Sequence, residues 1–427
     1  MGESMRILYI SYNGALEPLG QSQVLPYLRE LAGHGLEFTL LTFEKKQASL
    51  LDERRQKAQL KRELNQQGIA WHYLRYHKTP AVPATAWDVF LGLLYSTSLV
   101  IAKRIKVVHA RSYIPALMAL FVKRSFGVKF IFDMRGLWAD ERVDAGQCTR
   151  DSFEYKAIKL LERACLKAAD CVVVLTHKVK GILENSPPLQ GCNTPIEVIP
   201  CCVDTEKFMI DEEYRQRRRR ELGWTDKVVL VYAGSLGGWY LAEQMVDFFA
   251  VGLRKHPNLH FLVLTQSDHR LIADIFHAKV VSADSYTILT APPSEVAQYL
   301  NLADAGISFR KPSYSQVASS PTKLGEYLAC GLPIITNRGI GDSEEFIKSH
   351  SVGVIVSDFN ELTYTNALMT IIHMLSLDRS ALRQHCHTVA VRFLSLRNRG
   401  VEGYRTVYRR LSLGGVGGTP DMIGVEK

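Results

Sequence analysis

Short apolar runs of strand length alternate with helix-length segments from one end of this chain to the other. Such runs are typical of buried strands, and their regular separation by helices predicts parallel sheets covered by helices on both faces. The alternation therefore predicts an α/β protein. The expected strands are Arg6 to Asn13, Glu37 to Phe43, Val107 to Arg111, Lys129 to Arg135, Cys171 to Thr176, Ile196 to Pro200, Lys227 to Gly234, His260 to Thr265, Tyr286 to Ala291, Asp304 to Arg310, Leu332 to Asn337 and Val352 to Ser357.

The strands fall into two sets, and the composition changes between them. A chain of 427 residues is too long for one ordinary core. We therefore expect one doubly wound domain over 1–203 and a second over 204–395. A C-terminal helix over 396–413 is expected to pack back on the first domain, followed by a flexible Gly-rich tail over 414–427.

Between the two sets lies a run of arginines. We predict that the run is the solvated face of a linker helix, because no aromatic residues that could stack on bases interleave it. Nucleic acid is therefore not an expected partner. The arginines are Arg215, Arg217, Arg218, Arg219 and Arg220.

The formal net charge of +9 suits phosphorylated ligands, nucleic acid or an anionic membrane and does not choose among them. The first residues lack the charged segment and apolar core of a secretion signal, so we expect a cytoplasmic protein with reduced thiols. Residues 89–102 carry no charge but are too short to span a bilayer. They are predicted to form a buried helix, with an interfacial helix seated by Trp87 and Tyr95 as the alternative.

The segment from Ser319 to Ile335 reads as a short helix followed by a buried strand. Ser320 is expected at the N-cap and Pro321 at the first helical position. Gly331 is expected to end the helix, before a strand over Leu332 to Thr336.

This helix start predicts an anion site. The free amides of Thr322, Lys323 and Leu324 would face the anion, and Lys323 would add a mobile cation. Glu326, one turn later, would accept hydrogen bonds from a hydroxylated group attached to that anion. A phosphate with a sugar behind it fits this order of groups. The alternative is a capped helix whose Lys323 and Glu326 pair in solvent.

Several catalytic motifs are absent from the sequence. There is no G-x-G-x-x-G after a first strand, no G-x-x-x-x-G-K-[ST] loop and no G-x-S-x-G elbow. There is also no H-E-x-x-H, and no aspartate stands two positions from another. A metal site is therefore not expected.

Four segments carry a resemblance that covers nearly the whole chain. They are Gly20 to Leu28, Phe132 to Arg142, Ile199 to Asp204 and Glu326 to Pro333. The first resembles the loop and helix that close over the donor in family 4 glycosyltransferases of the GT-B type. The second is similar to a segment of bacterial surface-polysaccharide members. The third resembles the family's I-P-N-G-V-D junction, and the fourth matches its donor-site motif. The implied fold is two Rossmann-like domains that face each other across an interdomain cleft.

The resemblance implies transfer of a sugar from a nucleoside diphosphate sugar, with retained configuration, to a lipid-linked or oligosaccharide acceptor in cell-surface polysaccharide assembly. Glu326 corresponds to the family's glutamate that binds the donor's ribose. Because no paired aspartates are available to hold a metal, we expect Lys323 and Arg310 to hold the diphosphate, with Lys311 in reserve. No cofactor is expected besides the donor substrate.

Candidate residues of the first domain lie after its first strand and at the end of the strand over Lys129 to Arg135, where the cleft is expected. Gly20 and Gln21 would let the backbone approach the donor phosphates, although Gly20 could equally be an ordinary loop glycine. Asp133 and Arg135 are expected to pair and to orient the acceptor or a sugar hydroxyl. For Arg135 the alternative is a buried structural ion pair.

Three positions depart from the family pattern. Ala318 stands where a second glutamate commonly reaches the donor sugar, residues 234–240 lack a common Arg and Lys pair, and Arg135 replaces a histidine. The first two departures favour one alternative, a non-catalytic scaffold subunit. A second alternative is a nucleotide-sugar epimerase, which has the same two-sheet plan and needs no acceptor channel. Peripheral contact with the inner face of the cell membrane is a further expectation, from the net charge and the apolar segment.

Overall fold

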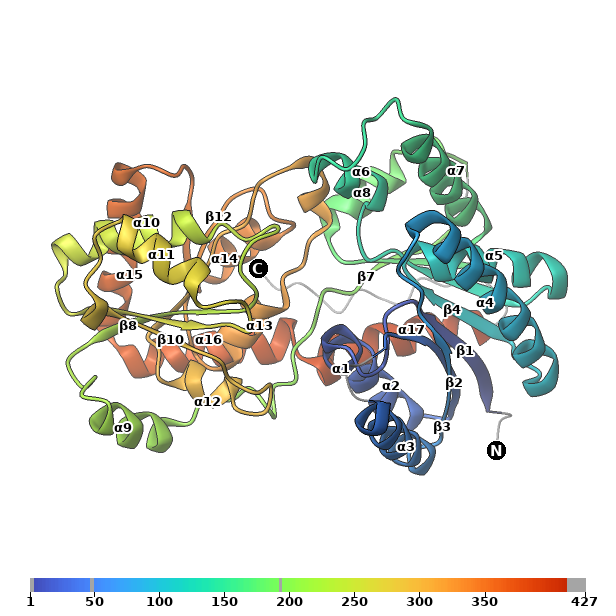
Figure 1. The fold of residues 1–427 in the computed structure, drawn as a ribbon, viewed down its shortest axis with the longest axis horizontal. Coiled ribbons are helices and arrows are strands. Elements are labelled where there is room, and N and C mark those ends of the chain that lie inside the picture. The colour runs from blue at the N-terminus through green and yellow to red at the C-terminus, as the bar shows by residue number, and fades with distance from the viewer. Residues whose placement is uncertain (1–3, 47–49, 192–193, 413–427) are drawn as a thin grey trace.

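The first domain is a parallel sheet of seven strands with helices on both faces (Figure 1). This computed structural model describes residues 4–46, 50–191 and 194–412. The strand order is β3-β2-β1-β4-β5-β6-β7, the order of a doubly wound nucleotide-binding fold. The strands are β1 (Met5–Ser11), β2 (Leu36–Glu44), β3 (Ile69–Arg75), β4 (Val107–Arg111), β5 (Lys129–Asp133), β6 (Cys171–Val174) and β7 (Ile196–Val198). The helices are α1 (Pro18–Gln23), α2 (Leu25–Ala32), α3 (Leu50–Gln66), α4 (Ala81–Lys103), α5 (Tyr113–Phe126), α6 (Trp138–Asp144), α7 (Phe153–Ala168) and α8 (His177–Glu184).

The second domain repeats this plan with a six-stranded parallel sheet in the order β10-β9-β8-β11-β12-β13. The predicted class, two doubly wound Rossmann-like domains, is therefore confirmed. The strands are β8 (Val228–Ala233), β9 (Leu259–Leu264), β10 (Tyr286–Leu289), β11 (Ala305–Ser308), β12 (Ile334–Asn337) and β13 (Gly353–Val356). The helices are α9 (Glu212–Glu221), α10 (Ala242–Lys255), α11 (Arg270–Ala278), η1 (Ala283–Ser285), α12 (Val296–Asn301), η2 (Tyr314–Ala318), α13 (Thr322–Ala329), α14 (Ser343–His350), α15 (Glu361–Leu377) and α16 (Arg379–Phe393).

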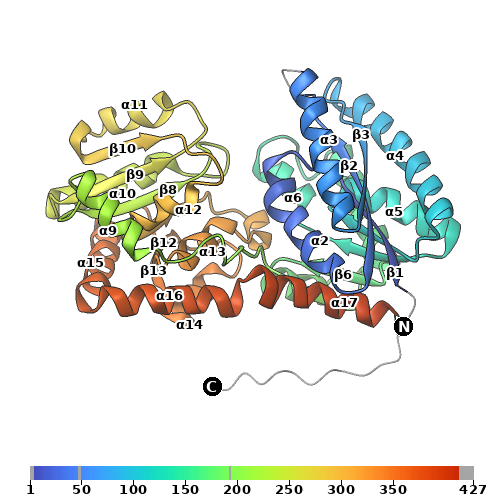
Figure 2. The ribbon, with the colours of Figure 1, turned by 90° about the horizontal axis from the view of Figure 1, so that it is seen from below.

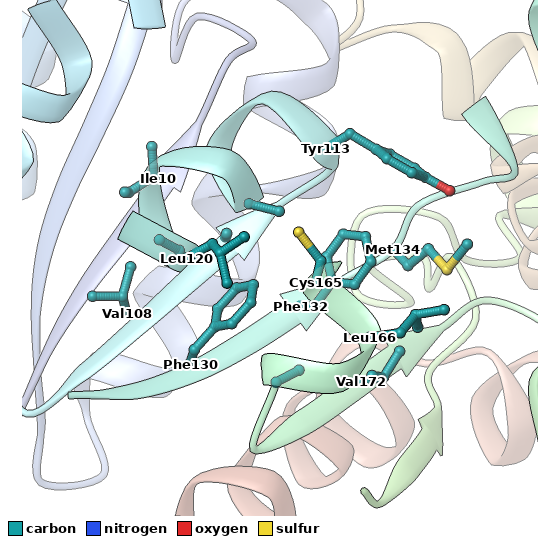
Figure 3. Close-up of a cluster of buried hydrophobic side chains, with 14 of the residues drawn as sticks. Ile10, Val108, Tyr113, Leu120, Phe130, Phe132, Met134, Cys165, Leu166 and Val172 are labelled. Atoms are coloured by element: carbon teal, nitrogen blue, oxygen red, sulfur yellow. The ribbon is translucent and has the colours of Figure 1, made fainter. Parts of the chain in front are cut away.

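The sheets are buried because their central strands are apolar throughout: β4 is buried at all five positions and β9 at all six. Figure 3 shows part of the first core, where Phe130 and Phe132 of β5 belong to one cluster with Leu120 of α5 and Leu166 of α7. Burial of such side chains is the main favourable contribution to folding, and it keeps the strands and their ends in fixed positions.

The chain crosses between the domains twice, at one place. The Val203 amide donates to the Leu394 carbonyl and the Leu396 amide donates to the Val203 carbonyl, both at 2.8 Å. The two connecting segments are therefore tied to each other where they cross.

After the second crossing, η3 (Leu396–Val401) and α17 (Glu402–Ser412) lie against the first sheet, as Figure 2 shows. Tyr404 and Tyr408 of α17 share a buried cluster with Ile7 of β1 and Phe38 of β2. Residue 413 and the predicted tail over 414–427 lie outside the described residues.

The carboxyl ends of the strands in the two domains face each other. The Asp144 carboxylate, beyond β5, accepts a hydrogen bond from the Ser315 amide at 2.8 Å. The Thr176 hydroxyl, after β6, donates to the Val317 carbonyl at 2.8 Å. Asp342, after β12, accepts from the amide that opens α8 at 2.6 Å. In doubly wound folds ligands bind at these strand ends, so the site is expected between the domains.

The arginine run is only partly solvated, which corrects the prediction for two of its members. Arg215 and Arg219 are buried and bind the two carboxylate oxygens of Asp304, at 2.5 and 3.1 Å. Asp304 precedes β11 in the core and needs counter-charge there, because an unpaired buried carboxylate is costly. Arg217 and Arg220 are exposed, as predicted for a linker helix.

Helix α4 is not the buried helix that the sequence predicted. Within the described residues it is the one helix apolar and long enough to cross a membrane, over Val82–Lys103, and only 33% of that window is buried. Trp87, Phe90 and Leu94 are 51%, 50% and 56% exposed. The helix packs by one face and presents an apolar face outward.

Candidate active site

Lys323, near the start of α13, lies in a cage of two tyrosine rings. Its ammonium nitrogen is 3.5 Å from the centroid of the Tyr240 ring and 4.4 Å from that of Tyr232. It also donates a hydrogen bond to the Tyr232 hydroxyl at 3.3 Å. Aromatic faces attract a cation at these distances. The side chain is therefore held in place, which corrects the prediction of a mobile cation.

Burial, together with the nearby Arg310 guanidinium, lowers the pKa of Lys323 to about 7, although Glu326 opposes the shift. A lysine with such a pKa gains strongly from an anion that replaces its lost hydration. The cage thus holds a cation-forming group without giving it a fixed counter-ion.

Gly234 makes this arrangement sterically possible. It follows β8 with a φ of 149°, and a Cβ there would lie 2.5 Å from the Lys323 nitrogen. The backbone of the Gly-rich loop 234–240 therefore runs directly against the ammonium group.

Arg310, just beyond β11, shares the Tyr240 ring with Lys323. Its guanidinium carbon is 5.0 Å from the ring centroid, and it donates to the Tyr240 hydroxyl at 3.4 Å and to the Gln316 side-chain oxygen at 3.1 Å. Two cationic side chains thus flank one ring, as a diphosphate site requires. Lys311, the reserve candidate, is exposed.

The start of α13 differs in detail from the prediction. The N-cap is Pro321, not Ser320, and the helix begins at Thr322. The Ser320 hydroxyl instead accepts a hydrogen bond from the Cys201 amide at 3.1 Å, which links this turn to the domain crossing.

Two of the three predicted amides remain available to a ligand. The Leu324 amide donates to the Pro321 carbonyl at 3.2 Å and its side chain belongs to the core, so Leu324 does not face a ligand. Within the described residues, no hydrogen bond engages the amides of Thr322 and Lys323. Those two amides are the free N–H groups at the positive end of the helix dipole.

Glu326 lies one turn further along α13, beside Lys323. Burial raises the pKa of its carboxyl group, whereas Lys323 and Lys207 lower it. Among the parts of the chain that the structure describes, no hydrogen bond or ion pair reaches this carboxylate. Its oxygens are therefore free to accept hydrogen bonds from a ligand's hydroxyl groups.

Asp133 and Arg135 do pair, but Asp133 lies too deep to contact an acceptor. Its side chain is 0% exposed, with Arg135 at 3.6 Å and Arg111 at 3.7 Å, and it accepts a hydrogen bond from the Tyr404 hydroxyl at 3.0 Å. This burial corrects the predicted contact between Asp133 and the acceptor. Asp133 instead anchors Arg135, whose guanidinium donates to the Cys201 sulfur at 3.2 Å beside the domain crossing.

Gly20 and Gln21 lie in α1, where they hold the loop after β1 together. A Cβ at Gly20 would lie 2.1 Å from the Gly14 carbonyl oxygen, and the Gln21 amide group donates to the Ala15 carbonyl at 2.7 Å. Gly20 is therefore required for packing within this loop, and the structure assigns neither residue a place beside Lys323.

The structure thus brings together Lys323, Arg310 and Glu326, with the Thr322 amide beside them. The two tyrosines of the cage were not predicted. Their signal in the sequence is weak: Tyr240 is the last residue of the Gly-rich loop that replaces the family's Arg and Lys pair, and Tyr232 is the second-last residue of the strand before it. In residues 4–46, 50–191 and 194–412, no group of three or more His, Cys, Asp and Glu side chains could hold a metal ion.

Two protein families match parts of the chain. Residues 20–202 match the glycosyl transferase 4-like domain, and residues 306–379 match the C-terminal domain of glucosyltransferase 3-like proteins. No curated protein sequence matches the chain.

Solved structures share the fold over nearly the full length. A glycosyltransferase from Rickettsia africae is 14% identical, with a TM-score of 0.70 over 97% of this chain and 100% of that one. HepE of Anabaena, in complex with UDP and glucose, is 12% identical, with a TM-score of 0.67 over 96% and 99%. WaaG, a glycosyltransferase involved in lipopolysaccharide biosynthesis, is 14% identical, with a TM-score of 0.65 over 96% and 100%. Likeness at this level of identity shows the fold.

Proposed function

The chain is a GT-B protein whose first domain is glycosyl transferase 4-like, consistent with family 4, and we propose that it moves a sugar from a nucleoside diphosphate sugar to an acceptor hydroxyl. The observation that carries this proposal is the cluster of Lys323, Arg310 and Glu326 at the start of α13. Two cations and free helix amides suit a diphosphate leaving group, and a free carboxylate suits a ribose. HepE, which shares this fold, was solved with UDP.

We propose that transfer occurs with retention and without a metal ion. Cations already present at the diphosphate site can neutralise the charge that develops on the leaving group. A leaving phosphate that stays in place can also accept the proton of the incoming hydroxyl, so no protein base is required. Activity should therefore survive an excess of chelator, and the product's anomeric configuration, read by NMR, should equal that of the donor.

The acceptor that we propose is a lipid-linked or oligosaccharide glycan of the cell surface. The experiment incubates the protein with a panel of nucleoside diphosphate sugars and with lipid-linked acceptors extracted from bacterial membranes. Release of nucleoside diphosphate together with glycan elongation supports the proposal. Isomerisation of the donor would indicate the epimerase, and no reaction with any pair would indicate the scaffold.

A lipid-linked acceptor fits the outer face of the first domain. Helix α4 packs beside α5, where Leu117 and Phe121 are also exposed, and the two helices lie side by side in Figures 1 and 2. Exposed cations lie at the C-terminal ends of both helices, at Lys103, Arg104 and Arg124. An apolar face with a basic edge is complementary to an anionic bilayer. We propose that this face rests on the cytoplasmic side of the membrane.

Sedimentation with vesicles tests this contact. The full chain should bind vesicles that contain anionic phospholipid, and the double variant W87S/F90S should bind at least about tenfold less, because it loses two exposed aromatic side chains that would enter the bilayer. The matched control is L271S/L362S, which removes two exposed leucines from the second domain. Equal loss in both variants, or no binding by the unaltered protein, would contradict the membrane contact.

A further inference from the structure

Glu141 belongs to the part of the first domain that contacts the second domain. It belongs to α6, the short helix after β5, and this helix packs on η2 of the second domain. The hydrogen bond from the Ser315 amide to Asp144 fixes the end of α6 there at 2.8 Å. The helix that carries Glu141 is therefore held in place by both domains.

The carboxylate of Glu141 is folded back over Gly136. A Cβ at position 136 would lie only 2.2 Å from one of its oxygens, so a larger residue there would push the carboxylate aside. The side chain is only partly exposed, and burial raises the pKa of its carboxyl group. Within the described residues, no hydrogen bond or ion pair satisfies this carboxylate. A shielded, unpartnered carboxylate costs free energy, so its retention needs a reason.

Arg310 faces Glu141 from the second domain. Its guanidinium is near enough to lower the pKa of Glu141, yet the two groups form no ion pair. Arg310 is instead held by Gln316 and Tyr240. The Glu141 carboxylate of the first domain and the Arg310 guanidinium of the second domain are therefore close to each other but unpaired, beside the proposed diphosphate site.

The second domain has no carboxylate at the last residue of η2, which is Ala318. Ala318 is 4% exposed and belongs to the buried cluster of the first domain, where a glutamate could not be accommodated without its charge being buried. Position 318 therefore supplies no carboxylate to a bound sugar, whereas the first domain holds Glu141 near Arg310.

We propose that Glu141 accepts a hydrogen bond from a hydroxyl group of the donor's sugar while Arg310 binds the diphosphate. The inference rests on the proposed function and assigns its sugar specificity to a residue of the opposite domain. The two charges match two adjacent parts of a nucleotide sugar: Arg310 suits the anionic diphosphate, and Glu141 suits the hydroxyl donors of the sugar. No covalent step involves Glu141.

Calorimetry with paired ligands tests the assignment. The probes are a panel of UDP-, GDP- and dTDP-sugars and the parent nucleoside diphosphates. E141Q should bind the preferred nucleotide sugar about tenfold more weakly, because a charge-assisted hydrogen bond becomes a neutral one, and should bind the parent diphosphate unchanged. The matched control is E154Q on α7, whose carboxylate pairs with Arg142 outside the contact between the domains, and it should change neither affinity.

A urea titration separates this role from a structural one. A glutamate that holds α6 in place would lower the unfolding midpoint when neutralised, whereas an unpartnered carboxylate should leave the midpoint unchanged or raise it. Equal weakening of both ligands, no weakening of either, or a lowered midpoint would overturn the assignment of Glu141 alone. If the unaltered protein binds no nucleotide sugar of the panel, the proposed function fails, and this inference fails with it.

Discussion

The caged lysine makes donor binding depend on pH. In the donor-free protein the pKa of Lys323 is about 7. A diphosphate bound beside it favours the charged ammonium, so binding takes up a proton wherever the free lysine is neutral. A nucleotide sugar is esterified at both ends of its diphosphate, so it has no monoester group that titrates near neutral pH and adds nothing to this uptake.

The size of the effect follows from the pKa. The charged fraction of Lys323 is about 0.9 at pH 6, 0.5 at pH 7 and 0.1 at pH 8, so the affinity for a nucleotide sugar should fall about tenfold between pH 6 and pH 8. Proton uptake should accordingly rise from about 0.1 to about 0.9 per donor bound over the same interval.

Isothermal titration in buffers of different ionisation enthalpy measures both quantities. The matched variant is K323M, which keeps an unbranched side chain one atom shorter and removes its charge. K323M should bind weakly, with an affinity that hardly changes between pH 6 and pH 8 and with little proton uptake. Zero uptake by the unaltered protein at pH 8, or the same pH dependence in K323M, would show that the diphosphate does not bind at this lysine.

Two further results are expected from the buried charges. Between pH 10.5 and about 7 the unfolded chain binds more protons at residue 323 than the folded protein does, so the lysine lowers stability at neutral pH. K323M should therefore raise the free energy of unfolding at pH 7 by up to about 5 kcal/mol, and this gain should disappear towards pH 10.5. A lower urea midpoint for K323M at pH 7 would contradict this. Asp133 is held by Arg135, His109 and Arg111, which lower its pKa against the effect of burial, so its contribution is present at neutral pH and is lost in acid. D133N should therefore cost about 3 kcal/mol in urea unfolding at pH 7, because two guanidinium groups lose their counter-charge; an unchanged midpoint would refute the anchoring role.

Most strands could be predicted because burial on both faces leaves a continuous apolar run. β3 was missed, since its residues alternate between buried and exposed side chains around Trp71 and His72. The burial of Arg215 and Arg219 was missed for a different reason. A run of like charges does not reveal which residue it pairs with. The partner is Asp304, which lies 89 residues from Arg215 in sequence, and its buried carboxylate binds both guanidinium groups.

The site was predictable where it depends on local sequence and unpredictable where it depends on packing. Lys323 and Glu326 follow from one helix start and do lie together. Asp133 ends a strand at the expected edge, yet Tyr404, 271 residues further on, covers it. Tyr240 and Glu141 gain their positions from loops and domain contacts that no local pattern encodes.

The return of α17 to the first sheet has a consequence for biosynthesis. The hydrogen bond from Arg410 to Glu197 joins residues 213 positions apart, and Tyr404 and Tyr408 complete a core that β1 and β2 begin. During translation the early strands must therefore wait, with that apolar surface uncovered, while the whole second domain is made. A nascent chain halted before residue 402 would expose a surface that chaperones recognise, and only the last helix closes it.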